Sequence, residues 1–142
     1  YHLPAYATLP TAGYVESQLA RGRKNATVTA VGYGLQAATQ NPVKQAEKTQ
    51  ADRVRYQADL MVVDTKGVAG IGNLPGSFSM TLSGDAKHGG TCFGDSGGPS
   101  LHGDTLVAVT SFGLNGNCAG IGGVYRIDGD AQLAWINSLL AG

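Results

Sequence analysis

Charged residues are scarce in this sequence, and those present carry no surplus of either sign. Lys and Arg together number 10, Asp and Glu together number 10, and charged residues make up only 14% of the 142 positions. A chain without net charge has no overall field that would attract nucleic acid or an anionic membrane surface. We therefore expect neither nucleic acid nor a membrane as a partner.

Long hydrophobic runs are missing too. No stretch reaches the roughly 18 apolar residues that a membrane-spanning helix needs. The chain opens on Tyr1-His2-Leu3-Pro4, without the charged and apolar segments of a secretory signal peptide. We expect that the original N-terminus was removed, or that the sequence starts partway through a longer protein.

Cysteine is limited to Cys92 and Cys118, which form no Cys-x-x-Cys metal or redox motif. A zinc site needs about four ligands, more than these thiols and the scattered histidines comfortably supply. The two thiols either form one disulfide, which would indicate an oxidising, extracytoplasmic compartment, or stay unpaired and buried. The disulfide, and with it secretion, is the favoured interpretation, and no metal or other cofactor is predicted.

Amphipathic helical patterns are few, whereas glycine occupies 22 positions and separates short runs of β-branched residues. This pattern is typical of an all-β fold, and the chain has the length of one domain. One run alternates Phe78, Met80 and Leu82 with Ser79 and Thr81, which predicts a strand with a single buried face. About six strands are predicted to form a barrel-like domain, at residues 27–31, 56–63, 77–82, 100–101, 105–112 and 124–127.

The C-terminal segment has the clearest helical pattern, predicted over residues 129–141. Asp128 and Asp130 are both suitable N-caps, and their charge suits the positive start of a helix. A shorter helix is predicted within 13–22, and residues 1–12 have the prolines of a connector. The apolar stripe of the C-terminal helix recurs at helical spacing, at Leu133, Trp135, Ile136, Leu139 and Leu140.

The segment Gly94-Asp95-Ser96-Gly97-Gly98-Pro99 has the composition of a catalytic loop. Glycine lets the backbone turn tightly and approach a ligand closely, and amides freed by such a turn can converge on a developing oxyanion. The Ser96 hydroxyl would then act as the nucleophile. The alternative is a glycine-rich turn that carries an unreactive surface serine.

The spacing Gly94-x-Ser96-x-Gly98 also fits the nucleophile elbow of α/β-hydrolases, whose triad follows in the order serine, acid, histidine. The only histidine after Ser96 is His102, and no acidic residue lies between them. Pro99 also opposes the helix that should follow an elbow. The elbow interpretation is therefore rejected.

The serine motif matches the sequence around the nucleophile of chymotrypsin-like (trypsin-like) serine proteases, and the whole chain resembles the C-terminal half of that family. The resemblance implies a six-stranded, trypsin-like antiparallel β-barrel over residues 1–142, the second barrel of a two-barrel protease, followed by a closing helix. The other matching segments appear in the family's order and spacing: Gly32-Tyr33-Gly34, Ser111-Phe112-Gly113, Gly123-Val124-Tyr125 and the helix around Trp135-Ile136.

The same resemblance implies roles for particular residues. Ser96 would be the nucleophile of the family's serine mechanism, and the backbone amides of Gly94 and Ser96 would form the oxyanion hole. Cys92 and Cys118 would form a disulfide that ties the serine loop to the pocket loop. The substrate-binding residues would be Gly90, Thr91, Phe93, Ser111, Phe112, Gly113 and Gly123.

The resemblance also bears on specificity. Gly90 would lie at the base of the primary pocket, where an acidic residue would select Arg or Lys. Without that acid, we expect cleavage after apolar residues, from Leu or Met up to Phe or Tyr, with basic residues disfavoured. Asp85, in the loop that leads to the pocket, is the one residue that could swing inward and reverse this preference.

The chain departs from the family because it carries no match to the triad's histidine and aspartate, which belong to an N-terminal barrel. His2, His88 and His102 lack the family's setting for the base, and Asp95 is expected to shape the loop through an ion pair or hydrogen bonds. Two functions remain. One is a serine endopeptidase, acting on protein or peptide substrates, whose N-terminal barrel is missing from this sequence. The other is a non-enzymatic, protease-like binding module. Retention of Ser96 and of both oxyanion-hole positions favours the first.

Overall fold

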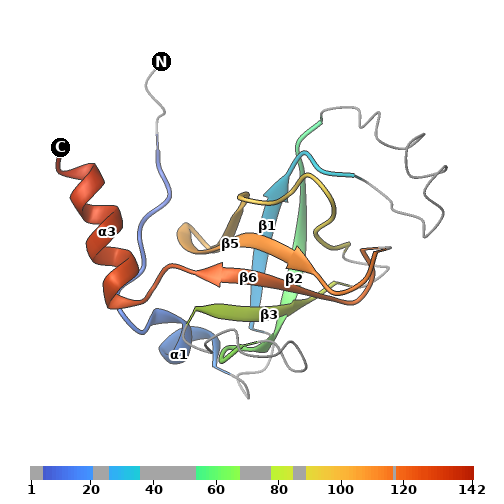
Figure 1. The fold of residues 1–142 in the computed structure, drawn as a ribbon, viewed down its shortest axis with the longest axis horizontal. Coiled ribbons are helices and arrows are strands. Elements are labelled where there is room, and N and C mark those ends of the chain that lie inside the picture. Colours follow the sequence, from blue (N-terminus) through green and yellow to red (C-terminus); the bar gives the residue numbers. More distant parts are fainter. Residues whose placement is uncertain (1–4, 21–25, 36–53, 68–77, 85–88, 117) are drawn as a thin grey trace.

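The computed structural model describes residues 5–20, 26–35, 54–67, 78–84, 89–116 and 118–142. Six antiparallel strands close into a barrel in the order β1-β2-β3-β6-β5-β4 (Figure 1). This architecture confirms the predicted all-β barrel. The strands are β1 (Thr27–Gly32), β2 (Tyr56–Asp64), β3 (Ser79–Ser83), β4 (Pro99–His102), β5 (Thr105–Gly113) and β6 (Ile121–Arg126).

The barrel interior holds one apolar core, to which the short helix α1 (Tyr14–Leu19) contributes Val15 and Leu19. These two side chains are fully buried and stand four residues apart, on one face of the helix. Each buried aliphatic side chain of this size contributes about 1.5–3 kcal/mol. The remaining core residues come from the strands: Val28, Ala30, Leu60, Met80, Leu82, Val107, Ala108 and Val124.

Strand β3 corrects the prediction of a single buried face. Ser79, Met80, Thr81 and Leu82 are all buried. One face points into the core, whereas on the other the Thr81 hydroxyl donates to the carbonyl of Gly67 at 2.7 Å. A chain segment outside the barrel wall therefore covers the face that the alternation assigned to solvent.

Strand β6 begins at Ile121, three positions earlier than residue 124, where the sequence pattern placed its start. Gly122 and Gly123 are strand residues because β3 and β5 pair with them from both sides. The hydrogen bonds to the two neighbouring strands hold these glycines in the sheet, although glycine itself has only a weak preference for strands. This extension brings two glycines next to the end of β5.

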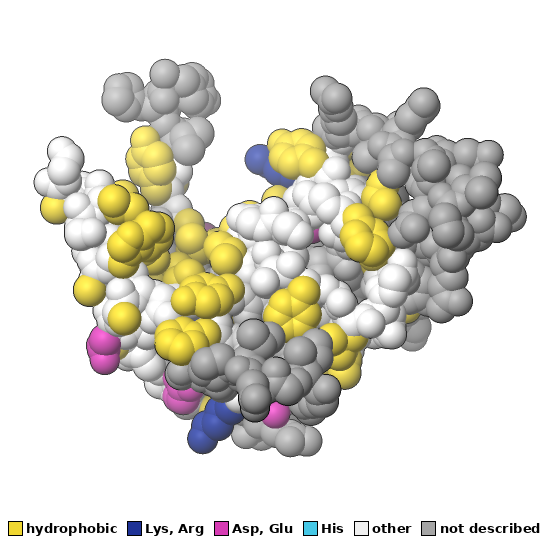
Figure 2. Space-filling view, viewed as in Figure 1, with side chains coloured by type: hydrophobic (Ala, Val, Ile, Leu, Met, Phe, Trp, Pro, Cys, Tyr) yellow, Lys and Arg dark blue, Asp and Glu magenta, His cyan; other side chains and the backbone are white. Residues whose placement is uncertain are grey.

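The C-terminal helix α3 (Asp130–Leu140) lies within one residue of its predicted bounds at each end. The capping prediction was wrong, because Gly129 occupies the N-cap and makes no side-chain bond there. Asp130 lies in the first turn of the helix, and the buried carboxylate of Asp128 bonds to Arg126 and Val15 instead. No residue of α3 is buried, and Trp135 and Leu140 are 66% and 72% exposed. Figure 2 shows hydrophobic side chains gathered over this helix and over the strands beside it.

The segment before α1 is attached to the barrel. Thr8 forms a parallel bridge with Thr105, and its amide and carbonyl bond to Asp104 and Leu106 at 2.8 and 2.9 Å. The predicted connector therefore runs beside the start of β5 over its described part. Among the described residues, no helix has the length and apolarity to span a membrane.

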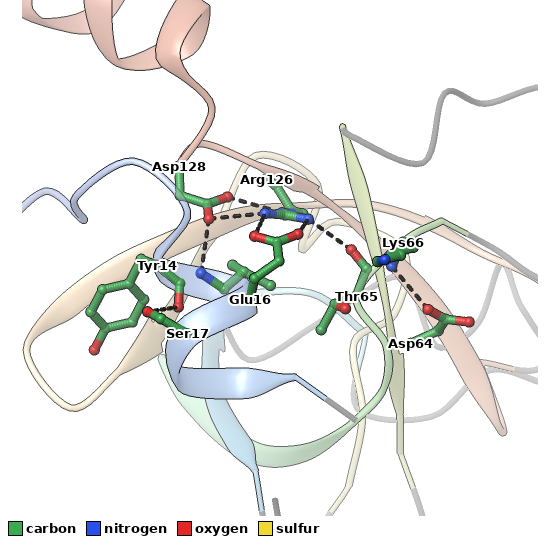
Figure 3. A network of polar contacts seen from close by, with 9 residues as sticks. Tyr14, Glu16, Ser17, Asp64, Thr65, Lys66, Arg126 and Asp128 are labelled. Carbon is green, nitrogen blue, oxygen red and sulfur yellow. Dashed lines mark hydrogen bonds and ion pairs between the residues drawn. The ribbon is translucent and has the colours of Figure 1, made fainter. Parts of the chain in front are cut away.

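A buried charged network fixes α1 to the end of β6 (Figure 3). Arg126 donates through Nε and Nη2 to the Asp128 carboxylate, both at 2.9 Å, and through both Nη atoms to Glu16 at 2.6 Å. Arg126 Nη1 also donates to the carbonyl of Thr65 at 2.8 Å, and Asp128 accepts from the amide of Val15 at 2.8 Å. Asp128 thus serves two elements at once.

The network changes the pKa values of Arg126, which is buried, and of Glu16, which is partly exposed. Burial alone would lower the pKa of Arg126, but the hydrogen bonds that it donates to Glu16 and Asp128 outweigh burial and raise that pKa above its ordinary value. The Arg126 hydrogen bond lowers the pKa of the Glu16 carboxyl below its ordinary value of 4.5, against the opposing effect of burial. The guanidinium therefore stays charged, as arginine does in proteins generally.

Candidate active site

The serine loop consists of two successive tight turns between β3 and β4. The amide of Asp95 donates to the carbonyl of Cys92 at 3.1 Å, and the amide of Gly98 donates to the carbonyl of Asp95 at 2.9 Å. Gly94 and Gly97 have φ angles of 98° and 81°, which side chains with a Cβ rarely adopt. The two glycines therefore let the chain turn on either side of Ser96, whose side chain is exposed.

Asp95 anchors this loop to the end of β1. Its carboxylate accepts from the amides of Gly34 and Cys92 at 2.8 and 2.9 Å. A Cβ on Gly34 would lie 2.6 Å from the carboxyl carbon, and one on Gly32 would overlap the carboxylate oxygen. The Asp95 carboxylate therefore packs closely against the backbone of Gly32 and Gly34. The predicted hydrogen bonds of Asp95 are confirmed.

Strand β5 holds the other side of the loop. The Thr110 carbonyl accepts from the amide of Gly97 at 2.8 Å, and the Thr110 amide donates to the carbonyl of Gly98 at 2.9 Å. Gly98 leaves no room for a side chain, since a Cβ there would lie 2.7 Å from the carbonyl oxygen of Val31. The amides of Gly94 and Ser96 take no part in these loop bonds.

Cys92 and Cys118 are bonded to each other, with their Cα atoms 5.1 Å apart, which confirms the predicted disulfide. The bond joins the serine loop to the loop between β5 and β6. Cys118 has a φ of 59°, and its amide donates to the carbonyl of Asn115 at 3.0 Å, so a tight turn presents this cysteine. Two loops that are far apart in sequence are thus held side by side.

A cavity of about 340 Å³ opens between these two loops, and Ser96 lies on its lining. Its inner end reaches the core residues Leu60, Leu82 and Val124. The structure therefore brings together most of the residues that the sequence placed in a substrate pocket. Those on the lining are Gly90, Thr91, Phe93, Ser111, Phe112 and Gly113.

Gly94 and Gly123 do not line the cavity. Gly123 is buried, and a Cβ built on it would overlap the ring of Phe112. Phe112 and Gly123 are cross-strand partners in the ladder between β5 and β6, next to a bulge in β5. An aromatic ring that covers a glycine of the neighbouring strand helps to fix the register of the two strands. In this structure Phe112 occupies the space beside Gly123.

Histidine does not line the cavity in the described part of the chain. His102 lies at the end of β4, half-buried, with Nδ1 2.9 Å from the hydroxyl of Tyr14. His2, His88 and Asp85 lie outside the described residues. Among the residues that are described, no three His, Cys, Asp or Glu side chains gather as metal ligands would.

The sequence analysis missed Thr110, a buried residue on the cavity lining. It also missed Arg126 and Asp128 as a buried pair. Alternation along β5 carried a usable signal, because Thr110 has the same parity as the core residue Ala108 and precedes Ser111 directly. For the charged pair, the signal was an arginine and an aspartate flanking Ile127 in an otherwise apolar run.

Solved structures of three proteins share the fold. The scabies mite inactivated protease paralogue S-I1 aligns with a TM-score of 0.61 at 21% identity, over 95% of this chain and 52% of that one. GrC aligns at 0.62 and 18%, over 96% and 53%, and HL collagenase at 0.64 and 18%, over 100% and 58%. The chain thus spans about half the length of the solved structures that it matches.

Comparison with curated protein sequences found no match. A comparison with family models gave one match, to the model described as Trypsin, over residues 9–136. This range contains every strand of the barrel, the serine loop and both cysteines. The chain therefore belongs to the trypsin family.

Proposed function

We propose that this chain is the serine-bearing half of a serine endopeptidase. Ser96 attacks the carbonyl carbon of a peptide bond, and its hydroxyl proton passes to a histidine base. The amides of Gly94 and Ser96 donate to the oxyanion that develops. The histidine returns this proton to the nitrogen of the scissile bond as the tetrahedral intermediate collapses and the C–N bond breaks, and water then hydrolyses the resulting acyl-enzyme.

The observation that carries this proposal is the position of Ser96, exposed on the lining of the cavity between two loops that a disulfide joins. The turns of the loop use the amides of Asp95, Gly97 and Gly98, whereas the amides of Gly94 and Ser96 form no backbone bond to any described residue of the loop and could donate to a ligand. Amide donors fixed in advance stabilise an oxyanion without reorganising during the reaction. Because the turns of the loop do not use the amides of Gly94 and Ser96, these two amides could form an oxyanion hole.

The base and its orienting acid come from a further barrel. Serine hydroxyls are poor nucleophiles at neutral pH without a base, and the described part of the cavity lining contains no histidine. The solved structures that match extend over nearly twice this length. The exposed apolar residues of α3, including Trp135, Leu139 and Leu140, offer the surface on which such a barrel would pack.

The cavity favours uncharged side chains. No acidic residue lines it within the described part of the chain, and Gly90 provides no side chain at the position that the family uses for charge selection. Burying the charge of an Arg or Lys there without a partner would cost more free energy than burial of its apolar stem contributes. An apolar side chain gains about 1.5–3 kcal/mol by burial. The substrates are therefore proteins or peptides cut after apolar residues, with basic ones disfavoured.

The disulfide between Cys92 and Cys118 supports an extracytoplasmic location for this activity. Such bonds persist in oxidising compartments and are rare in the cytosol. Secretion is consistent with a protease that works on proteins outside the cell.

A second candidate is a protease-like binding module without catalysis. It is favoured by one observation, that a structure sharing this fold is described as an inactivated protease paralogue. In that case the cavity would bind a peptide without cutting it. Active-site chemistry then distinguishes the two functions.

The test is covalent labelling with a fluorophosphonate, which reacts with activated serines. We expect the chain of residues 1–142 alone to resist labelling, because no histidine lines the described part of its cavity. The full-length protein, or this chain mixed with an N-terminal barrel, should label at Ser96, and the variant Ser96→Ala should not. Stoichiometric labelling of the isolated chain would contradict the requirement for a second barrel. Absence of labelling in the full-length protein, with peptide binding intact, would favour the binding module.

A further inference from the structure

The loop between β5 and β6 contains the pair Asn115-Gly116, which the proposed mechanism leaves unused. Asn115 is the one asparagine of the sequence that precedes a glycine. Both residues are exposed, and both belong to the lining of the cavity that contains Ser96. The side-chain amide of an asparagine has an electrophilic carbon, and the backbone nitrogen of the next residue can reach it. The pair therefore has the groups that an intramolecular cyclisation needs.

The surroundings of Gly116 leave its nitrogen open to react. The amide of Gly116 forms no hydrogen bond with the described residues. Apart from its chain neighbours, no atom lies within 4 Å of a Cβ built on Gly116. Glycine also has no side chain that would hinder ring closure, and its backbone reaches conformations that other residues avoid. No described contact thus holds this nitrogen away from the Asn115 side chain.

A hydrogen bond across the loop holds the Asn115 side chain in place. Its Nδ2 donates to the carbonyl of Ala119 at 2.8 Å, and the Asn115 carbonyl accepts from the amide of Cys118 at 3.0 Å. The side chain must leave Ala119 before its Cγ can meet the Gly116 nitrogen. Breaking one exposed bond between neutral groups slows the reaction by about tenfold at most. The folded loop therefore delays the cyclisation but does not prevent it.

We propose that Asn115 is a site of spontaneous deamidation, through attack of the Gly116 nitrogen on the Asn115 Cγ. As the new C–N bond forms, the proton of that nitrogen passes through water to the departing NH2 group, which leaves as ammonia. The product is a succinimide ring. Water then adds to one of the two ring carbonyls and opens the ring to aspartate or isoaspartate. Both products carry a carboxylate where a neutral amide stood.

The new carboxylate changes the chemical character of the cavity, and the use made of that change rests on the proposed function. No acidic residue lines the cavity in the described part of the chain. After deamidation, one residue of the lining carries a negative charge, and a Lys or Arg side chain of a peptide gains a counter-charge. A carboxylate also cannot donate to the carbonyl of Ala119, so the bond across the loop is lost. Deamidated protein should therefore accept basic side chains better than unmodified protein does.

The first experiment follows the modification itself and does not depend on catalysis. The full-length protein is kept for several days in mildly alkaline buffer, and peptide mapping by mass spectrometry with an isoaspartate methyltransferase assay locates the products. We expect conversion at Asn115 and none at Asn137. Asn137 precedes Ser138 within α3, where backbone amides are held by bonds to carbonyls four residues back.

The matched variant is Gly116→Ala, which adds a methyl group beside the attacking nitrogen. The added Cβ meets no described atom, so the variant should fold as the wild type does. We expect it to deamidate about tenfold more slowly, which corresponds to about 1.4 kcal/mol in the barrier. Absence of conversion at Asn115, while a synthetic peptide of the same loop sequence converts, overturns the inference. Equal conversion at Asn115 and Asn137 overturns it too.

The second experiment measures the effect on the cavity. Calorimetry compares the binding of the peptides Ala-Ala-Lys and Ala-Ala-Met to the full-length wild type, to Asn115→Asp and to Asn137→Asp, which adds the same charge on α3. We expect the ratio of Lys to Met affinity to rise about twofold to fivefold in Asn115→Asp alone. An unchanged ratio overturns the effect assigned to the cavity. Wild-type protein that deamidates at Asn115 but binds neither peptide supports the modification and rejects the proposed function.

Discussion

Removing the carboxylate of Asp128 should strongly destabilise the fold, because it leaves the buried charge of Arg126 without its main partner. Asp128 is 1% exposed and accepts from Arg126 Nε and Nη2 and from the amide of Val15. In Asp128→Ala, the buried guanidinium keeps the Thr65 carbonyl and Glu16, whose side chain is 45% exposed. A buried charge that loses its main partner costs about 3–5 kcal/mol.

That cost should appear as a large fall in the midpoint of thermal unfolding. For a domain of this length, a change of 1 kcal/mol moves Tm by about 3–4 °C, so Asp128→Ala should lower Tm by about 10–20 °C. Circular dichroism of the full-length protein measures it. The control is Asp59→Ala, an exposed aspartate that accepts one hydroxyl bond from Thr29 at 2.6 Å and should cost about 1 kcal/mol or less.

A paired substitution tests the reasoning itself. If the unpaired charge causes the loss, then Arg126→Met combined with Asp128→Leu should be more stable than Asp128→Ala alone, because no buried charge is left without a partner. A Tm for Asp128→Ala within about 2 °C of wild type would refute the argument. So would a paired variant less stable than the single one.

Three further changes test separate features of the structure. Replacing Cys92 and Cys118 together by Ala should cost about 3–4 kcal/mol in the chain-entropy model, measured by urea unfolding, and a loss below about 1 kcal/mol would contradict the loop-closure argument. Gly34→Ala forces a Cβ to within 2.6 Å of the Asp95 carboxyl carbon and should cost about 1–3 kcal/mol; unfolding unchanged within about 0.5 kcal/mol would show that the loop yields without strain. Because the pKa of Glu16 is lowered in the folded state, its stabilisation is complete above its unfolded pKa near 4.5 and is lost as the pH falls through the lower folded value. Glu16→Gln should therefore flatten the acid limb of the stability curve, and an identical limb in both proteins would contradict this origin.

Local signals in the sequence were sufficient for the serine loop and the barrel. Gly94 and Gly97 adopt positive φ angles that follow from their lack of a side chain, and the strands lie where β-branched runs alternate with glycine. The pairing of Cys92 with Cys118 was also predictable, since the chain has no other cysteine and resembles a disulfide-bonded family. These features depend on residue type and on near neighbours in the chain.

Tertiary structure alone decided which polar and aromatic groups meet. The exposure assigned to Ser79 and Thr81 was wrong, since both are buried, and the backbone of Gly67, just after β2, contacts the outer face of β3 through the Thr81 hydroxyl. Asp128 looked like a helix cap, yet closure of the barrel brings it to the start of α1, where a buried amide and a buried guanidinium bind it more strongly than solvent does.

The shape of the pocket was equally beyond the sequence. The ring of Phe112 covers Gly123 because the bulge in β5 sets those two residues opposite each other, and no single strand contains that register. Whether the Thr110 hydroxyl has a hydrogen-bond partner depends on all the residues around it, and none of the described ones offers a partner. Sequence thus determined which groups can react and turn, whereas the closed barrel determined which of them share a cavity, because closure fixes distances between residues that the chain itself leaves far apart.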